Sequence, residues 1–142
     1  MLLHDNFIGL DQTSCSYEFE NTEDEKRFFQ VKDKMPMDWY YKDRKIVYSI
    51  NELGHRSISV KNVDFDNYIL FTGCSHTYGV GLELETTYPY LVAQNLKMSY
   101  YNLALGGTGI DTMFYNLTTW ISRYKKPKLI VIQCPEKNRF LL

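Results

Sequence analysis

The chain has 142 residues, 44% hydrophobic and 23% charged, and its 16 basic and 17 acidic residues give a formal net charge of −1. This balance offers no attraction for nucleic acid or an anionic membrane, and no apolar run approaches the roughly 20 residues that span a bilayer. The three cysteines form no CxxC pair and the N-terminus has no basic segment before an apolar one, so we expect a cytoplasmic protein without a disulfide framework or signal peptide.

Residues 1–66 are expected to form an irregular lead-in segment. Thr22 and Glu25 are spaced to cap a short helix that ends near Val31. The run 45–50 is rich in β-branched and aromatic residues and predicts a strand. An aromatic-rich segment of this kind is expected to pack on the edge or face of the sheet that follows it.

Residues 67–142 are expected to form an α/β domain. Three short apolar runs predict buried strands at 68–71, 99–103 and 129–133. Two helices are predicted between them, one that begins at Thr87 and ends at Lys97 and one over 111–124. This alternation implies right-handed crossovers and a parallel sheet.

Each predicted helix has an apolar side that should face the sheet. In the first helix this side consists of Tyr90, Leu91, Ala93 and Leu96. In the second helix it consists of Met113, Phe114, Leu117, Trp120, Ile121 and Tyr124. The helical spacing is clearest in the second helix.

The most distinctive stretch follows the first of these strands and reads G-C-S-H-T-Y-G at 73–79. A strand that stops at Gly73 and turns towards a helix places the next side chains at the carboxyl end of a parallel sheet. Open α/β folds bind their ligands at that end. Ser75 is therefore the first candidate for a functional side chain.

This stretch resembles the first block of the SGNH (GDSL-type) hydrolases, G-D-S-x-T-x-G, with Cys74 in place of the aspartate. The resemblance implies a flavodoxin-like, three-layer α/β/α fold with a parallel sheet. It also implies that Ser75 is the nucleophile and that its backbone N–H is one of three oxyanion donors. The run N-L-A-L-G-G-T at 102–108 resembles the second block and assigns a further donor to Gly107, with Gly106 as the alternative.

The run Y-S-I-N-E-L-G-H-R at 48–56 resembles a lead-in segment that precedes the catalytic domain in some SGNH-like proteins. The family's third block, G-x-N-D, is replaced here by C-P-E-K at 134–137. Asn138 and the Gln133 amide are the remaining candidates for the third oxyanion donor, and neither matches the motif.

The family's last block, D-x-x-H, carries the histidine that acts as general base, and this chain has no such motif. Its histidines are His4, His55 and His76. His76 is expected to be a polar turn residue, because neighbouring side chains diverge, and His55 reaches the site only if the lead-in segment folds over it. The simplest interpretation is the N-terminal portion of a longer hydrolase, with an α/β domain that is incomplete at its C-terminus.

The resemblance implies a serine esterase or acyl-hydrolase that acts on a small-molecule ester or an acylated carbohydrate, without a cofactor or metal. A serine hydroxyl is a poor nucleophile without a base, so we expect slow or absent turnover by this chain alone. If the sheet ends at 129–133, its outer edge is uncovered and permits a homodimer.

Two alternatives remain open from the residues alone. A non-catalytic SGNH-like or flavodoxin-like module could bind carbohydrate, phosphate or a partner protein, since the loop 75–81 begins a helix and is rich in glycine. Cys74, Cys134 and His76 could also hold zinc, although their spacing fits no standard ligand pair.

Overall fold

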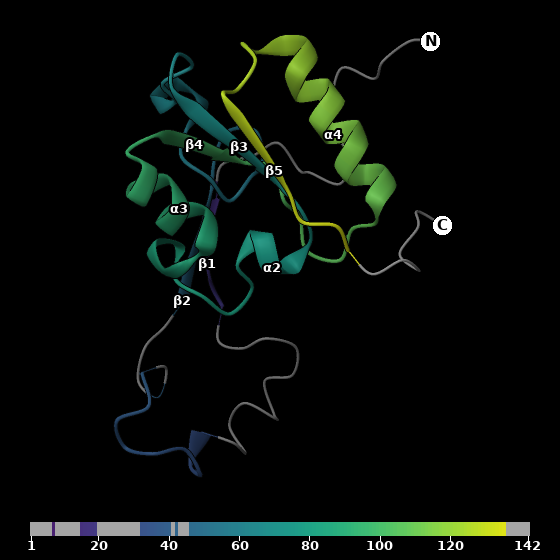
Figure 1. Ribbon diagram of the computed structural model, residues 1–142. Helices are drawn as coiled ribbons and strands as arrows, with labels where there is room; N and C mark the ends of the chain where they lie inside the picture. Colours follow the sequence, from purple (N-terminus) through teal and green to yellow (C-terminus); the bar gives the residue numbers. More distant parts are fainter. Residues whose placement is uncertain (1–6, 8–14, 20–31, 41, 43–45, 136–142) are drawn as a thin grey trace.

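A computed structural model describes residues 7, 15–19, 32–40, 42 and 46–135 (Figure 1). In chain order its elements are β1 (Cys15–Phe19), β2 (Ile46–Ile50), the 3₁₀ helix η1 (Val60–Asn62), β3 (Tyr68–Thr72), α2 (Ser75–Tyr78), the 3₁₀ helix η2 (Leu84–Thr86), α3 (Tyr88–Leu96), β4 (Ser99–Asn102), α4 (Ile110–Arg123) and β5 (Leu129–Ile132). The helix predicted to end near Val31 lies outside the described residues. Across the described ranges, no helix combines the length and apolar character needed to cross a membrane.

Three strands form a parallel sheet in the order β4-β3-β5. The predicted α/β class and parallel sheet are therefore confirmed. Leu70 of β3 lies in register with Tyr101 of β4 on one side and Ile130 of β5 on the other. Because the chain passes from the central strand first to one edge and then to the other, the carboxyl ends of β3 and β5 form a topological switch point.

Alternate residues of the central strand pack against different helices, as the two-residue period of a strand requires. Tyr68 and Leu70 share a core cluster with Trp120 of α4, whereas Ile69 and Phe71 share a cluster with Ala93 of α3. The two helices flank the sheet in Figure 1. All five residues of β3 are buried, as predicted for this strand.

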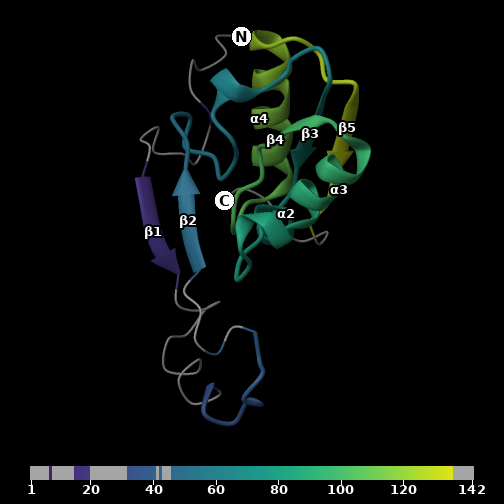
Figure 2. The ribbon, with the colours of Figure 1, turned by 90° about the vertical axis from the view of Figure 1, so that its left-hand side faces the viewer.

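The lead-in segment contributes a separate antiparallel pair of strands, β1 and β2, which stands beside the parallel sheet in Figure 2. β1 was not predicted from the sequence. Residues on both sides of this pair join the core: Phe7, before β1, and Val63, after β2, belong to the cluster on the α4 side of the sheet. The Ser57 hydroxyl accepts a hydrogen bond from the backbone N–H of Asn102, 3.0 Å away.

The predicted apolar side of α3 is wrong in part. Leu91 and Leu96 are 53% and 48% exposed, and the buried residues of the helix are Pro89 and Ala93. These two residues are four positions apart and so lie on one face of the helix. A small side chain such as that of Ala93 lets the helix approach the sheet closely, and the larger leucines point elsewhere.

The prediction that the third strand is buried is also wrong. Leu129, Ile130 and Ile132 of β5 are 43%, 37% and 41% exposed. β5 is an edge strand of the described sheet, and Trp120 and Leu117 of α4 pack over the residues of β3 and β4. Phe114, predicted to face the sheet from α4, is likewise 47% exposed.

Candidate functional site

The serine turn, residues 73–77, leads from the end of β3 into α2 at the switch point. Ser75 is the first residue of α2, and Cys74 before it is extended, with φ −98° and ψ −153°. The helix has only four residues and ends at Gly79, whose φ of +81° lies in the left-handed region that favours glycine. The half-buried Ser75 side chain thus stands at the carboxyl end of the sheet.

Gly73 allows the strand, the helix and β5 to approach one another closely. A Cβ at this position would lie 2.0 Å from the Thr77 hydroxyl oxygen and 3.1 Å from the Gln133 Cβ. No side chain fits in this space, which explains a glycine directly before the turn.

Gln133, the residue after β5, holds the turn from the other side. Its side-chain oxygen accepts hydrogen bonds from the Cys74 backbone N–H at 3.3 Å, the Cys74 thiol at 3.0 Å and the Thr77 hydroxyl at 3.3 Å. Its side-chain nitrogen donates to the Cys134 carbonyl at 3.0 Å. The Gln133 amide, a sequence-based candidate for the third oxyanion donor, therefore braces the serine turn. Asn138, the other candidate, lies outside the described residues.

The loop after β4 is tied to α2 through Asn102. The Asn102 side-chain nitrogen donates to the Thr77 carbonyl at 2.8 Å, and its side-chain oxygen accepts from the Ala104 N–H at 3.1 Å. Both views of the ribbon show this loop running past α2 (Figures 1 and 2). Since β3 and β4 are parallel, the Ser75 turn and the Gly107 loop lie at the same end of the sheet.

The two glycines of this loop are exposed, and a Cβ at Gly106 or Gly107 would meet no atom within 4 Å. Gly107 has φ +75°, a left-handed conformation. The backbone of the loop is therefore open to a molecule that approaches from solvent, as an oxyanion donor requires.

Arg56 of the lead-in segment clamps the chain that follows α2. Its guanidinium donates to the carbonyls of Tyr78 at 3.1 Å, Gly79 at 2.5 Å and Leu82 at 2.6 Å. The same group lies 3.9 Å from the centre of the Tyr48 ring, a cation–π arrangement. Arg56 is only 1% exposed, so these contacts are made away from water.

Tyr48 and Asn51 complete this clamp. The Tyr48 hydroxyl accepts from the Gly81 N–H at 2.6 Å. The Asn51 side-chain oxygen accepts from the backbone N–H groups of Leu53 and His55, both at 3.0 Å, and its nitrogen donates to the Tyr101 hydroxyl at 2.9 Å. The run Y-x-x-N-x-x-G-x-R thus supports the segment after the serine turn. The sequence did not predict this role for Tyr48, Asn51 and Arg56, and its only sign in the sequence was the resemblance of the run to a lead-in segment.

The described histidines are not hydrogen bonded to the Ser75 hydroxyl. His55 is buried on the α4 side of the sheet, where its Nδ1 lies 3.0 Å from the Tyr101 hydroxyl and its ring packs edge-on against Phe7. Burial lowers the pKa of His55 from 6.5 to about 3, so the ring is neutral at pH 7. His76 is exposed on α2, as expected for a polar turn residue, and His4 lies outside the described residues.

Within the described ranges, no three His, Cys, Asp or Glu side chains gather as metal ligands would. Cys74 is a buried free cysteine and Cys134 an exposed one, at the ends of neighbouring strands.

Tyr88 adds a further contact to the turn, because its hydroxyl lies 2.8 Å from that of Thr77.

Two hollows lie near, but not in, the serine turn. One of about 340 Å³ is lined by Val47, Ser49, Arg56, Glu83, Leu84 and Glu85. A second crevice, between α4 and β5, is too narrow to hold a water molecule and is lined by Thr72, Met113, Phe114, Leu117 and Ile132.

Comparisons of the chain with protein-family models, with curated proteins and with solved structures find no match.

Proposed function

We propose that the chain carries the nucleophile turn of an SGNH-type serine ester hydrolase, in a flavodoxin-like three-layer arrangement. The observation that supports this proposal is the place of Ser75. It is the first residue of a short helix after the central strand, at the topological switch point where open α/β folds bind ligands.

The surroundings of the turn give the proposal further support. Gln133 holds the turn from β5, and Arg56 holds the chain that follows it. Hydrolytic catalysis by a serine depends on a nucleophile and oxyanion donors that keep their positions during the reaction. A turn held from two directions meets this requirement better than an isolated surface loop.

In the proposed reaction the Ser75 hydroxyl oxygen attacks the carbonyl carbon of an ester, the bond from that carbon to the alcohol oxygen breaks, and the alcohol leaves with the proton of the serine. Water then hydrolyses the acyl-serine, which releases the acid and restores the Ser75 hydroxyl. The backbone N–H groups of Ser75 and Gly107 stabilise the negative charge on the carbonyl oxygen, and a single donor of this kind changes kcat by about 10²–10³. The substrate is a small-molecule ester or an acylated carbohydrate in the cytoplasm, and no cofactor takes part.

The proton of the Ser75 hydroxyl needs an acceptor. We propose that this base comes from outside the described residues, since His55 is buried and neutral on the α4 side of the sheet. Without a base, the Ser75 hydroxyl stays a weak nucleophile and attacks the ester slowly. We therefore expect slow turnover by this chain alone.

The test is hydrolysis of p-nitrophenyl acetate by the chain, by Ser75→Ala and by the matched control Ser122→Ala, which removes a hydroxyl from α4. We expect a slow rate that Ser75→Ala lowers to the buffer rate and Ser122→Ala leaves unchanged. Labelling by a fluorophosphonate, read as intact mass, should follow the same pattern.

Equal rates and equal labelling in the chain and in Ser75→Ala would overturn the proposal. Carbohydrate or phosphate binding that persists in Ser75→Ala, without labelling of the unaltered chain, would favour the non-catalytic binding module instead.

A further inference from the structure

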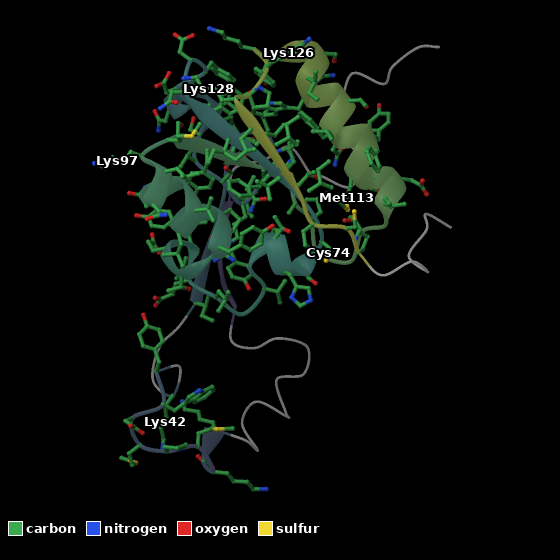
Figure 3. All side chains as sticks on the ribbon, viewed as in Figure 1. Lys42, Cys74, Lys97, Met113, Lys126 and Lys128 are labelled. Atoms are coloured by element: carbon green, nitrogen blue, oxygen red, sulfur yellow. The ribbon has the colours of Figure 1, made fainter. Side chains whose placement is uncertain are left out.

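One side-chain atom, the Oε1 oxygen of Gln133, contacts the chain on both sides of Ser75. It accepts hydrogen bonds from the backbone N–H and the thiol of Cys74, before the serine, and from the hydroxyl of Thr77, after it. Figure 3 shows Cys74 at the start of α2. The Gln133 side-chain nitrogen donates to the Cys134 carbonyl. A backbone N–H only donates and a carbonyl only accepts, so these two partners fix which end of the amide faces the turn.

The N-cap of α2 is not capped by its own side chain. Cys74 stands at this position, where residues with a side-chain oxygen are usual because that oxygen accepts from the first N–H groups of the helix. The Cys74 thiol makes no such bond and donates to Gln133 instead. In a capping box, a glutamine or glutamate three residues after the N-cap accepts from the N-cap N–H. That position in α2 is Thr77, and Gln133, directly after β5, accepts from the Cys74 N–H in its place.

A third element, α3, joins this network through Tyr88. The Tyr88 hydroxyl lies 2.8 Å from the Thr77 hydroxyl oxygen. The Thr77 hydroxyl has one proton, which it donates to Gln133, so Tyr88 is the donor in their contact. The hydrogen bonds therefore run in one direction, from Tyr88 through Thr77 to Gln133, and bonds in such a chain strengthen one another. Thr77 is buried, so water does not compete for them.

We propose that Gln133 and Tyr88 are positioning residues for Ser75, with the Gln133 side-chain oxygen acting as a cap that β5 supplies to α2. This inference rests on the proposed function, in which Ser75 provides both the nucleophile and an oxyanion donor. A four-residue helix is too short to hold these groups in place by itself. Displacing a reacting group by about 1 Å lowers a rate by about 100-fold. The network therefore sets the reactivity of Ser75 by fixing its position.

The rate at which a fluorophosphonate labels Ser75, followed by intact mass, tests the proposal. Gln133→Met keeps the length of the side chain but removes the oxygen, and we expect it to slow labelling by about 100-fold. Gln133→Glu keeps an acceptor oxygen towards the turn and should restore a rate close to that of the unaltered chain. The matched control Gln94→Met makes the same change at an exposed position of α3 and should leave the rate unchanged.

Tyr88→Phe gives a second, milder variant, since it removes one hydroxyl from a half-buried side chain. It breaks the donation to Thr77 and leaves the hydrogen bonds of Cys74 to Gln133 in place. We expect labelling that is slower than in the unaltered chain and faster than in Gln133→Met. If circular dichroism shows that Gln133→Met does not fold, an unchanged labelling rate in Tyr88→Phe would overturn the proposal.

Hydrogen exchange separates this proposal from the proposed function. The Cys74 amide should exchange faster in Gln133→Met than in Gln133→Glu, whether or not Ser75 reacts, because only the methionine lacks an acceptor oxygen. An unaltered chain that is not labelled would overturn the proposed function, and exchange at Cys74 would then decide the role of Gln133. Equal exchange in the two variants would overturn that role. With a reactive Ser75, labelling of Gln133→Met at the unaltered rate would overturn it as well.

Discussion

At the scale of single residues, the close packing of the serine turn depends on the missing Cβ of Gly73. The absence of a Cβ lets Thr77 and Gln133 meet over the backbone between β3 and α2. Gln133 can then accept hydrogen bonds from both Cys74 and Thr77. The position of Ser75 thus depends on a neighbour that has no side chain.

Replacing Gly73 with alanine should destabilise the protein by about 1–3 kcal/mol, the usual cost of adding a methyl group to a filled space. The new Cβ would lie 2.0 Å from the Thr77 hydroxyl oxygen, so strand and helix must move apart. Urea denaturation measures the free energy of unfolding.

Gly106→Ala is the matched control for this measurement. A Cβ there meets no atom within 4 Å, and we expect a change within about 0.5 kcal/mol. Similar losses for the two variants would contradict the close approach at Gly73.

At the scale of elements, the segment from β2 to η1 supports the C-terminal end of α2 and the chain that follows it. Arg56 binds the carbonyls of Tyr78, Gly79 and Leu82, and Tyr48 binds the N–H of Gly81. These groups lie at or just beyond the end of a four-residue helix, which is too short to be stable by itself. The lead-in segment therefore stabilises the helix that begins with Ser75.

Arg56→Lys should lower the free energy of unfolding by about 1.5–3 kcal/mol, the range for a hydrogen bond to a charged group. An ammonium group cannot reproduce the planar fork that reaches three carbonyls. Hydrogen exchange should also show faster exchange at the Gly81 amide, and urea denaturation gives the free energy.

Arg123→Lys serves as the control, because Arg123 is exposed and lies over the Phe7 ring at 5.4 Å. Its effect should stay within about 0.5 kcal/mol. Unchanged exchange at Gly81 in Arg56→Lys would contradict the clamp.

At the scale of the whole molecule, the α4 side of the sheet holds a cluster of aromatic rings. Tyr101 stacks on Trp120 with 4.0 Å between ring centres, and His55 packs edge-on against Tyr101. The His55 Nε2 is buried without a hydrogen-bond partner. Charging the ring there would place a cation in an apolar core, which is why the pKa of His55 falls to about 3.

This shift predicts acid destabilisation of the whole molecule. The unfolded chain binds a proton at His55 near pH 6.5 and the folded chain only near pH 3. Stability from the neutral ring is therefore complete above pH 6.5. It is lost by up to about 1.4 kcal/mol per pH unit as the pH falls through this window.

Urea denaturation between pH 4 and pH 7.5 tests this prediction in the chain and in His55→Phe. The variant should show a shallower dependence of the free energy of unfolding on pH, while His76→Gln, at an exposed position, should keep the original slope. Identical slopes in the chain and His55→Phe would contradict the neutral, buried state of His55.

The sequence by itself determined the local elements of this protein. Periodicity and turn residues predicted β3, β4, β5, α3 and α4 to within a residue or two, because strand and helix patterns depend on neighbours along the chain. The same reasoning placed Ser75 in a turn directly after the central strand. It missed β1, whose partner β2 is distant in the sequence.

Only the tertiary structure decided which apolar residues are buried and what holds the serine turn. β3 and β5 are both apolar in sequence, yet among the described strands β3 lies between two others and β5 at an edge. Arg56 reaches carbonyls 22 to 26 residues further along the chain. Strand order and contacts between residues this far apart in the sequence arise from the packing of the chain as a whole. Local sequence patterns therefore do not predict them.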